Sequence, residues 1–225
     1  FRRVLFRSEI RERLPNLTIQ ILQSEHINEE QKAAFVSITR QEMEKQITET
    51  PNDARYHLIY GIFLAQIGLF DDAIFYLEKT IELSPNKQTL YIEAARTHAR
   101  NGNNERMFDL VKTGYEIYKE NDDAWVAYAL AARIVGQENI YNNLLEEALT
   151  TGEYQKVINL LTTEIQNNPD LPDLQLTLAL VYSRAGQKEL AIQMIEELRA
   201  QYPNEFSQRG LEFIERIRSE ITLIQ

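Results

Sequence analysis

Cysteine is absent from this sequence of 225 residues, so disulfides and thiolate metal sites are excluded. Basic residues are fewer than acidic ones. The formal net charge of −10 argues against binding to nucleic acid, because a phosphate backbone attracts basic surfaces. No stretch approaches the roughly eighteen apolar residues of a membrane-spanning helix. Hydrophobic residues nevertheless make up 44% of the chain, which fits a folded protein.

Catalytic and metal-binding motifs are missing as well. The sequence has no G-x-S-x-G, no phosphate-binding G-x-x-x-x-G-K-[ST] and no H-E-x-x-H. The three histidines, His26, His57 and His98, are far apart in sequence, so we assign them structural roles rather than a metal site. We therefore expect no enzyme activity, no cofactor and no metal in this chain. An enzyme would require polar groups that converge in one deep pocket.

The first eight residues differ in character from the rest. There is no initiator Met, and three arginines stand among four apolar residues. The stretch Leu5-Phe6-Arg7-Ser8 can be encoded by CTCTTCCGATCT, which resembles the end of a common sequencing adapter. One hypothesis is that residues 1–8 are non-native adapter sequence joined to a truncated gene. The alternative is a basic amphipathic turn at the N-terminus.

A period of 34 residues runs through the chain. Glycine recurs at Gly68, Gly102 and Gly136. The same interval separates three further sets: His57, Tyr91 and Trp125; Gly61, Ala95 and Ala129; Pro51 and Pro85. A fixed period of this length predicts one supersecondary unit stacked several times, in which each unit buries its apolar face on its neighbours.

Apolar spacing and helix-ending glycines and prolines predict helices throughout. We expect a short helix on either side of Pro15 within 9–24, and a longer helix over 29–47. The expected helices after these are 54–67, 71–83, 88–100, 104–118, 123–135, 140–150, 154–167, 172–185, 188–201 and a closing helix over 205–221.

The repeat loses phase once. Gly136 and Gly152 are only 16 residues apart, so we expect a single helix where two would fit. The predicted division is a non-native segment (1–8), an N-terminal helical segment (9–50), a first repeat block (51–136), a phase break (137–152), a second block (153–203) and a capping helix (204–225).

The first unit resembles the tetratricopeptide repeat, a helix–turn–helix of 34 residues. The matching residues are His57, Tyr60, Gly61, Leu64, Gly68, Ala73, Leu77 and Pro85, and the similarity extends over about 51–203. The resemblance implies an all-α fold, an α-α superhelix of antiparallel helix pairs, with a capping C-terminal helix. It also implies a non-catalytic scaffold that binds a peptide or protein segment in a concave groove.

In this family certain positions of each first helix line the groove. The corresponding residues here are Arg55, Ile59, Ile62, Gln66, Glu93, Arg96, Arg100, Val126, Leu130, Arg133, Thr177, Leu180 and Arg184. Basic side chains among apolar ones would suit a peptide with an apolar anchor and an acidic group. The alternative is that these arginines are solvated or paired with nearby glutamates. The residues by which chaperone-binding repeats hold a terminal carboxylate are not reproduced.

Two segments also resemble the soluble C-terminal repeats of bacterial membrane proteins of the O-antigen ligase or polymerase type. They are Glu42–Tyr56 and Leu77–Gln88. This resemblance implies an alternative function, in which the chain is the assembly module of a membrane-embedded glycan-transferring protein. It would place the chain at the cell envelope; otherwise we expect the cytoplasm. No transferase residue can be carried over, because the membrane part is not in this sequence.

Overall fold

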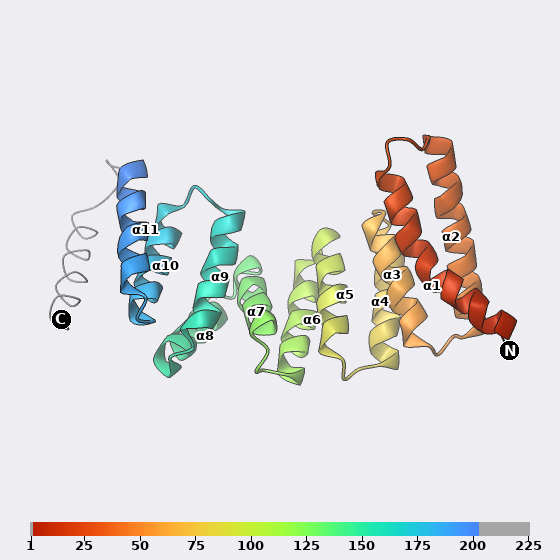
Figure 1. Cartoon of the computed structure of the whole chain (residues 1–225). Helices are drawn as coiled ribbons and strands as arrows, with labels where there is room; N and C mark the ends of the chain where they lie inside the picture. The colour runs from red at the N-terminus through yellow and green to blue at the C-terminus, as the bar shows by residue number, and fades with distance from the viewer. Residues whose placement is uncertain (1, 203–225) are drawn as a thin grey trace. The chain divides into compact units, whose positions relative to one another are not determined.

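Eleven helices and no strand make up the part of the chain that the computed structural model describes, residues 2–202, with side chains from residue 9 onward (Figure 1). The all-α prediction is therefore confirmed. The helices are α1 (Arg2–Gln23), α2 (Glu29–Glu49), α3 (Ala54–Gln66), α4 (Phe70–Leu83), α5 (Gln88–Arg100), α6 (Asn104–Ile117), α7 (Asp122–Ile134), α8 (Glu138–Thr151), α9 (Tyr154–Asn167), α10 (Pro172–Arg184) and α11 (Lys188–Gln201).

Local sequence signals set the helix ends. The side chain of Asn28 accepts a hydrogen bond from the backbone N–H of Gln31, and the side chain of Gln31 accepts one from the backbone N–H of Asn28, so α2 begins with a complete capping box. Asp53 caps α3 with its side chain. Gly68 and Gly102 follow α3 and α5 with positive φ angles of 82° and 77°. Glycine reaches this backbone conformation without a Cβ clash, so it ends the first helix of a pair.

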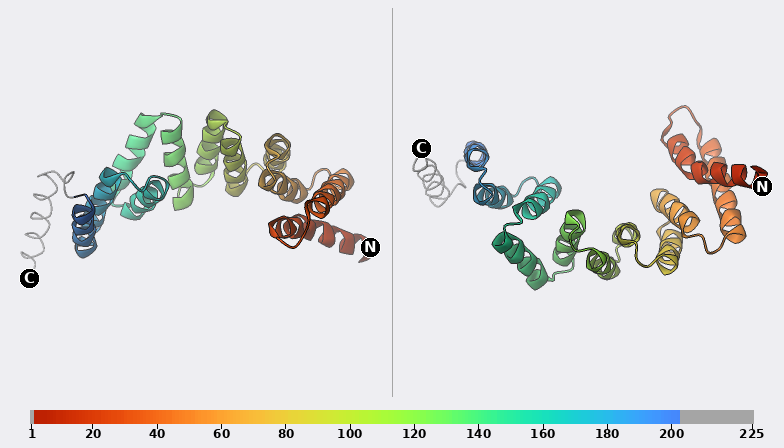
Figure 2. Two further views of the ribbon diagram at one scale, coloured as in Figure 1. Left: turned by 90° about the horizontal axis from the view of Figure 1, so that it is seen from above. Right: turned by 60° about the horizontal axis from the view of Figure 1, so that its bottom comes forward.

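The chain divides into two compact units between residues 124 and 125. In the first unit the pairs α1–α2, α3–α4 and α5–α6 each pack as hairpins, and consecutive hairpins contact one another through α2–α3 and α4–α5 (Figure 2). Its best-buried cluster includes Met43, Tyr60, Phe63 and Leu64, so it joins the second hairpin to the first. Sequential stacking of this kind is the expected geometry of a repeat array.

The N-terminal helix differs from the prediction. We expected two short helices around Pro15, but α1 continues through this proline. A proline inside a helix removes one backbone hydrogen bond and costs roughly 3 kcal/mol. Both halves of α1 are held on α2: Arg11 bonds Glu42 at 2.8 Å, and Thr18 bonds Thr39 at 2.6 Å. Contacts on both sides of the proline explain why the helix does not end there.

In the second unit, one helix, α8, occupies the interval between Gly136 and Gly152, as the loss of phase predicted. It is followed by α9 and by the hairpin α10–α11, whose core includes Ala179, Ala191 and Ile195. The division into repeat blocks stays a prediction. The expected capping helix over 205–221 lies outside the described residues.

Candidate functional site

The thirteen predicted groove residues lie on the first helices of the repeats, on α3, α5, α7 and α10. Seven are exposed, namely Arg55, Gln66, Arg96, Arg100, Arg133, Thr177 and Arg184. Six are half-buried, namely Ile59, Ile62, Glu93, Val126, Leu130 and Leu180. The first seven in chain order, Arg55 to Arg100, belong to the first unit and the other six to the second.

In the first unit the structure brings two of these helices together. Helices α3 and α5 are in contact, so equivalent positions lie on neighbouring helices. Ile59 packs against the core cluster from its half-exposed position, and Ile62 is one turn further along α3. On α5, Arg96 and Arg100 follow each other by one turn. The result is an apolar strip on α3 beside a basic strip on α5.

The arginines of the predicted groove differ in how they are paired. Arg55 Nη1 lies 2.6 Å from Glu12 of α1, and the same guanidinium lies over the Tyr56 ring. Arg96 pairs with Glu93 of its own helix at 2.8 Å. Arg100 makes no ion pair within residues 9–202. Arg100 is thus unpaired among the described side chains, whereas Arg55 joins α3 to α1.

Arg133 has a structural partner in the second unit. Its Nη1 lies 2.6 Å from Glu164 on α9, whose side chain is only 4% exposed. The Tyr141 hydroxyl lies 3.1 Å from both carboxylate oxygens of Glu164, and the Arg133 guanidinium lies over the Tyr141 ring. Burial, reinforced by the Glu164 charge, raises the pKa of Tyr141 to about 12. Glu164 is therefore compensated inside the protein, and Arg133 is committed to it.

The remaining candidates of the second unit lie on α7 and α10. Val126 and Leu130 are half-buried on α7, and Leu180 is half-buried on α10. Thr177 Oγ1 donates to the Asp173 carbonyl oxygen at 2.7 Å, which uses its hydroxyl within α10. Arg184 is exposed and makes no ion pair among the described side chains.

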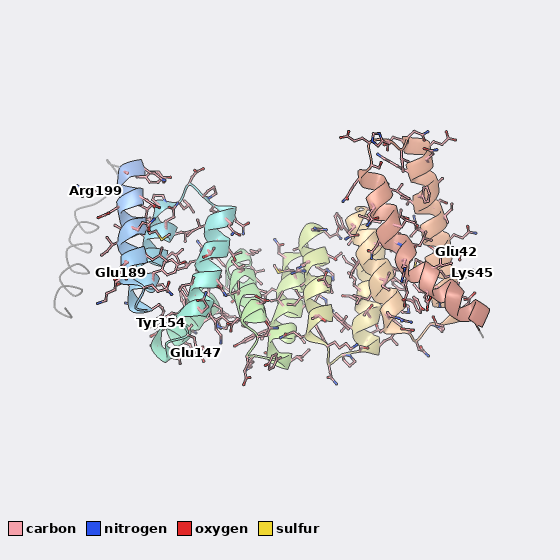
Figure 3. The ribbon with its side chains drawn as sticks, viewed as in Figure 1. Glu42, Lys45, Glu147, Tyr154, Glu189 and Arg199 are labelled. Atoms are coloured by element: carbon pink, nitrogen blue, oxygen red, sulfur yellow. The ribbon has the colours of Figure 1, made fainter. Side chains whose placement is uncertain are left out.

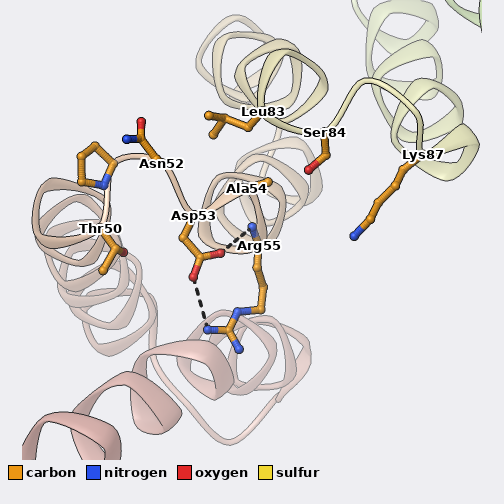
Figure 4. A pocket seen from close by; sticks show the side chains of 9 residues that line it. Thr50, Asn52, Asp53, Ala54, Arg55, Leu83, Ser84 and Lys87 are labelled. Carbon is orange, nitrogen blue, oxygen red and sulfur yellow. Dashed lines mark hydrogen bonds and ion pairs between the residues drawn. The ribbon is translucent and has the colours of Figure 1, made fainter.

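A surface pocket adds residues that the sequence reasoning missed. It has a volume of about 570 Å³, and it lies where the turn before α3 meets the turn before α5 (Figure 4). Arg55 lines it together with Ser84 and Lys87. The Asp53 carboxylate accepts a hydrogen bond from the backbone N–H of Arg55 at 3.0 Å and so caps the start of α3. The groove positions taken from the repeat family all lie within helices. They could not identify Lys87, which lies in a turn.

Two of the three histidines lie in the packed interior, whereas His26 is exposed. His57 and His98 are both buried, and so are Tyr91, Tyr128 and Trp125. Within the described residues there is no group of three or more His, Asp or Glu side chains that could hold a metal ion. None of the described helices is both long enough and apolar enough to cross a membrane.

Residues 148–211 match the family model of the tetratricopeptide repeat. This match supports the tetratricopeptide prediction, and a tetratricopeptide fold suggests a protein–protein interaction scaffold. A curated relative is the TPR repeat-containing protein YpiA of Bacillus subtilis (strain 168), which is 26% identical over 157 residues. The alignment covers 70% of this chain but 33% of YpiA, so the chain spans about a third of that relative's length.

Several solved structures are similar to this chain. YrrB, described as a TPR protein with an unusual peptide-binding site, is 15% identical with a TM-score of 0.46, covering 77% of this chain and 97% of YrrB. MamA is 16% identical with a TM-score of 0.44, covering 78% and 93%. A thermophilic TPR protein from Thermus thermophilus is 14% identical with a TM-score of 0.42, covering 94% and 99%.

Proposed function

We infer that this chain is a protein-interaction module whose first unit binds an extended peptide along α3 and α5. An apolar side chain of the peptide would rest on Ile59 and Ile62. An acidic group would pair with Arg96 and Arg100. The observation that carries the proposal is the apolar strip on α3, half-buried and open at the surface, beside two arginines on the neighbouring helix.

The pairing of the arginines supports the choice of the first unit. Arg96, which is exposed, pairs only with Glu93 of its own helix, and pairs at this spacing contribute about 0.2–0.5 kcal/mol. A ligand carboxylate can replace Glu93 at little cost. Displacing Glu164 from Arg133 would instead leave a buried carboxylate without compensation. Arg133 was a predicted groove residue, but we propose that it holds Glu164 and does not bind the ligand.

The proposal is tested with a random peptide library displayed on phage and selected on the unmodified chain. We expect enriched peptides that combine an apolar residue with Asp or Glu. The double variant Arg96→Glu/Arg100→Glu should bind them at least about tenfold more weakly, a difference of about 1.4 kcal/mol. A matched control is Lys112→Glu/Lys119→Glu, on α6 and just after it, which makes the same change in net charge in the same unit. Equal binding by the two double variants would contradict the proposal.

A second candidate is the alternative stated above, an assembly module of a membrane-embedded ligase or polymerase for O-antigen. The observation that favours it is spatial. The two segments that carry the resemblance, Glu42–Tyr56 and Leu77–Gln88, both contribute residues to the pocket of about 570 Å³. The gene sequence upstream of codon 9 tests this candidate. A run of codons for hydrophobic spans would support it, and a start codon directly before a soluble leader would exclude it.

A further inference from the structure

Helix α1 carries a row of apolar side chains that its neighbours leave partly uncovered. The row consists of Ile10, Leu14, Leu17 and Ile21, spaced so that they follow one side of a helix. Ile10 is 49% exposed and Leu17 is 48% exposed, while Leu14 and Ile21 are half-buried. We call these four residues the α1 stripe.

The other sides of α1 are occupied. Arg11 and Thr18 point toward α2, where they bond Glu42 and Thr39. The side that carries Glu12 and Ile19 packs toward α3, since Glu12 pairs with Arg55 and Ile19 joins the core cluster. Because successive residues are 100° apart on a helix, the α1 stripe lies on the side of α1 opposite to α3. Within residues 9–202 it forms the outer surface of the first hairpin.

Helix α2 continues this outer surface. Thr39 and Gln46 face α1, and Met43 is fully buried in the core. The remaining side of α2 carries Ile38, which is 50% exposed, and Lys45. Figure 3 shows Lys45 at the edge of α2 that is farther from α3 and α4. The stripe and Ile38 therefore form one apolar face across the hairpin.

We propose that this face binds the same face of a second copy of the chain, which makes the protein a symmetric dimer. The order of the residues in the α1 stripe supports this arrangement. Read from either end, it is isoleucine, leucine, leucine, isoleucine with spacings of four, three and four residues. Two such helices packed antiparallel about a twofold axis place Ile10 opposite Ile21 and Leu14 opposite Leu17 of the second copy. The stripe is thus complementary to itself.

The charges around the stripe agree with this arrangement. In the antiparallel register Arg13, which borders the stripe, lies between the neutral residues Asn16 and Gln20 of the second copy. On α2, Lys45 lies opposite Ile38, so its aliphatic stem packs while its ammonium group reaches toward Glu42 of the second copy. Lys45 makes no ion pair among the described side chains.

The size of the face sets the expected strength. The stripe extends over about 17 Å at 1.5 Å per residue. A face of this length buries less area than the roughly 800 Å² per partner that is typical of stable interfaces. We therefore expect a reversible dimer with a dissociation constant on the order of micromolar. Sedimentation velocity of the full chain from about 2 to 200 µM should show a monomer–dimer equilibrium in this range.

Two substitutions of exposed apolar residues separate the stripe from other surfaces. Leu17→Glu should weaken dimerisation at least about a hundredfold, because two charges would be buried against apolar side chains. Phe75→Glu is the matched control, because Phe75 is 67% exposed on another helix, α4, and its replacement should leave the dimer unchanged. Far-UV circular dichroism confirms that both variants remain folded.

The antiparallel register of the two α1 helices can be tested separately, even if the Leu17→Glu variant fails to fold. The chain has no cysteine, so Leu14→Cys and Leu17→Cys each introduce a single thiol. With a short bismaleimide, a mixture of these two variants should give more cross-linked dimer than either alone, because residue 14 faces residue 17. A chain that stays monomeric at the highest concentration, or a dimer that Leu17→Glu leaves intact, overturns the proposal. Equal cross-linking in the three samples also overturns it.

Discussion

Tyr91 donates its phenolic hydrogen to the carbonyl oxygen of Pro85 at 2.9 Å. An equivalent contact occurs one repeat earlier, where His57 Nε2 lies 2.8 Å from the Pro51 carbonyl oxygen. Each contact ties the first turn of a helix to the proline turn before it, six residues back. The 34-residue interval between His57 and Tyr91, and between Pro51 and Pro85, therefore separates two equivalent contacts. These contacts fix where the second of the two hairpins begins relative to the first.

Replacing Tyr91 by Phe removes this bond and keeps the ring. The hydrogen bond to the Pro85 carbonyl oxygen is lost, so we expect Tyr91→Phe to lower the free energy of unfolding by about 1 kcal/mol. Urea unfolding followed by circular dichroism measures this difference. Tyr118→Phe is the control, since Tyr118 is mostly exposed and its loss of a hydroxyl should have little effect. Equal stability of the two variants would show that the turn contact contributes nothing.

Gly61 is required by close packing, and the next repeat shows how the requirement can be relieved. A Cβ at Gly61 would lie 2.8 Å from Leu77 Cγ, so Gly61→Ala should destabilise the chain by about 1–3 kcal/mol. At the equivalent positions, 34 residues later, the chain has Ala95 and Val111. The double variant Gly61→Ala/Leu77→Val should regain much of the loss in thermal unfolding. If it is as unstable as Gly61→Ala, the steric explanation is wrong.

The Arg133–Glu164 pair makes a different kind of prediction. Arg133→Ala leaves the buried Glu164 carboxylate with only the Tyr141 hydroxyl, so we expect a loss of about 2 kcal/mol in the free energy of unfolding. Glu164→Gln in the Arg133→Ala background should recover part of that loss, because it removes the uncompensated charge. Arg184→Ala serves as the control on α10. A stable Arg133→Ala variant would return Arg133 to the candidate groove.

His98 predicts a dependence of stability on pH. Burial lowers its pKa below 6.5, and this effect exceeds the opposing attraction of Glu78, whose Oε1 lies 3.4 Å from Nε2. The unfolded chain then binds a proton near pH 6.5 while the folded chain stays neutral at His98. Stability is therefore fully present above about pH 6.5 and falls as the pH decreases, with a slope of at most about 1.4 kcal/mol per pH unit.

The measurement compares urea unfolding from about pH 7.5 to pH 5 for the unmodified chain and for His98→Gln. The variant should lose part of the slope that the unmodified chain shows. The control is His26→Gln, because His26 is exposed in the turn after α1. Identical slopes for the unmodified chain and His98→Gln would contradict the prediction.

The repeat spacing determined the helices, their ends and the fold class, because glycines, prolines and caps act locally along the chain. The helix over 138–151 was also predictable, since the interval between Gly136 and Gly152 leaves space for one helix. The continuation of α1 through Pro15 was not. It depends on Arg11 and Thr18, which meet α2 only in the folded hairpin.

The candidate groove shows the same limit. The positions of Arg55, Arg96, Arg100 and Arg133 in the repeat predict that they are exposed basic residues. The periodicity does not predict which of them form ion pairs. Only the tertiary structure shows that Arg55 pairs with Glu12 and Arg133 with Glu164, because those glutamates come from other helices. Hydrogen bonds within a helix are set by nearby residues, whereas ion pairs between helices depend on how the helices pack. The sequence thus determined the repeated hairpins, and the packing decided which side chains remain available to a partner.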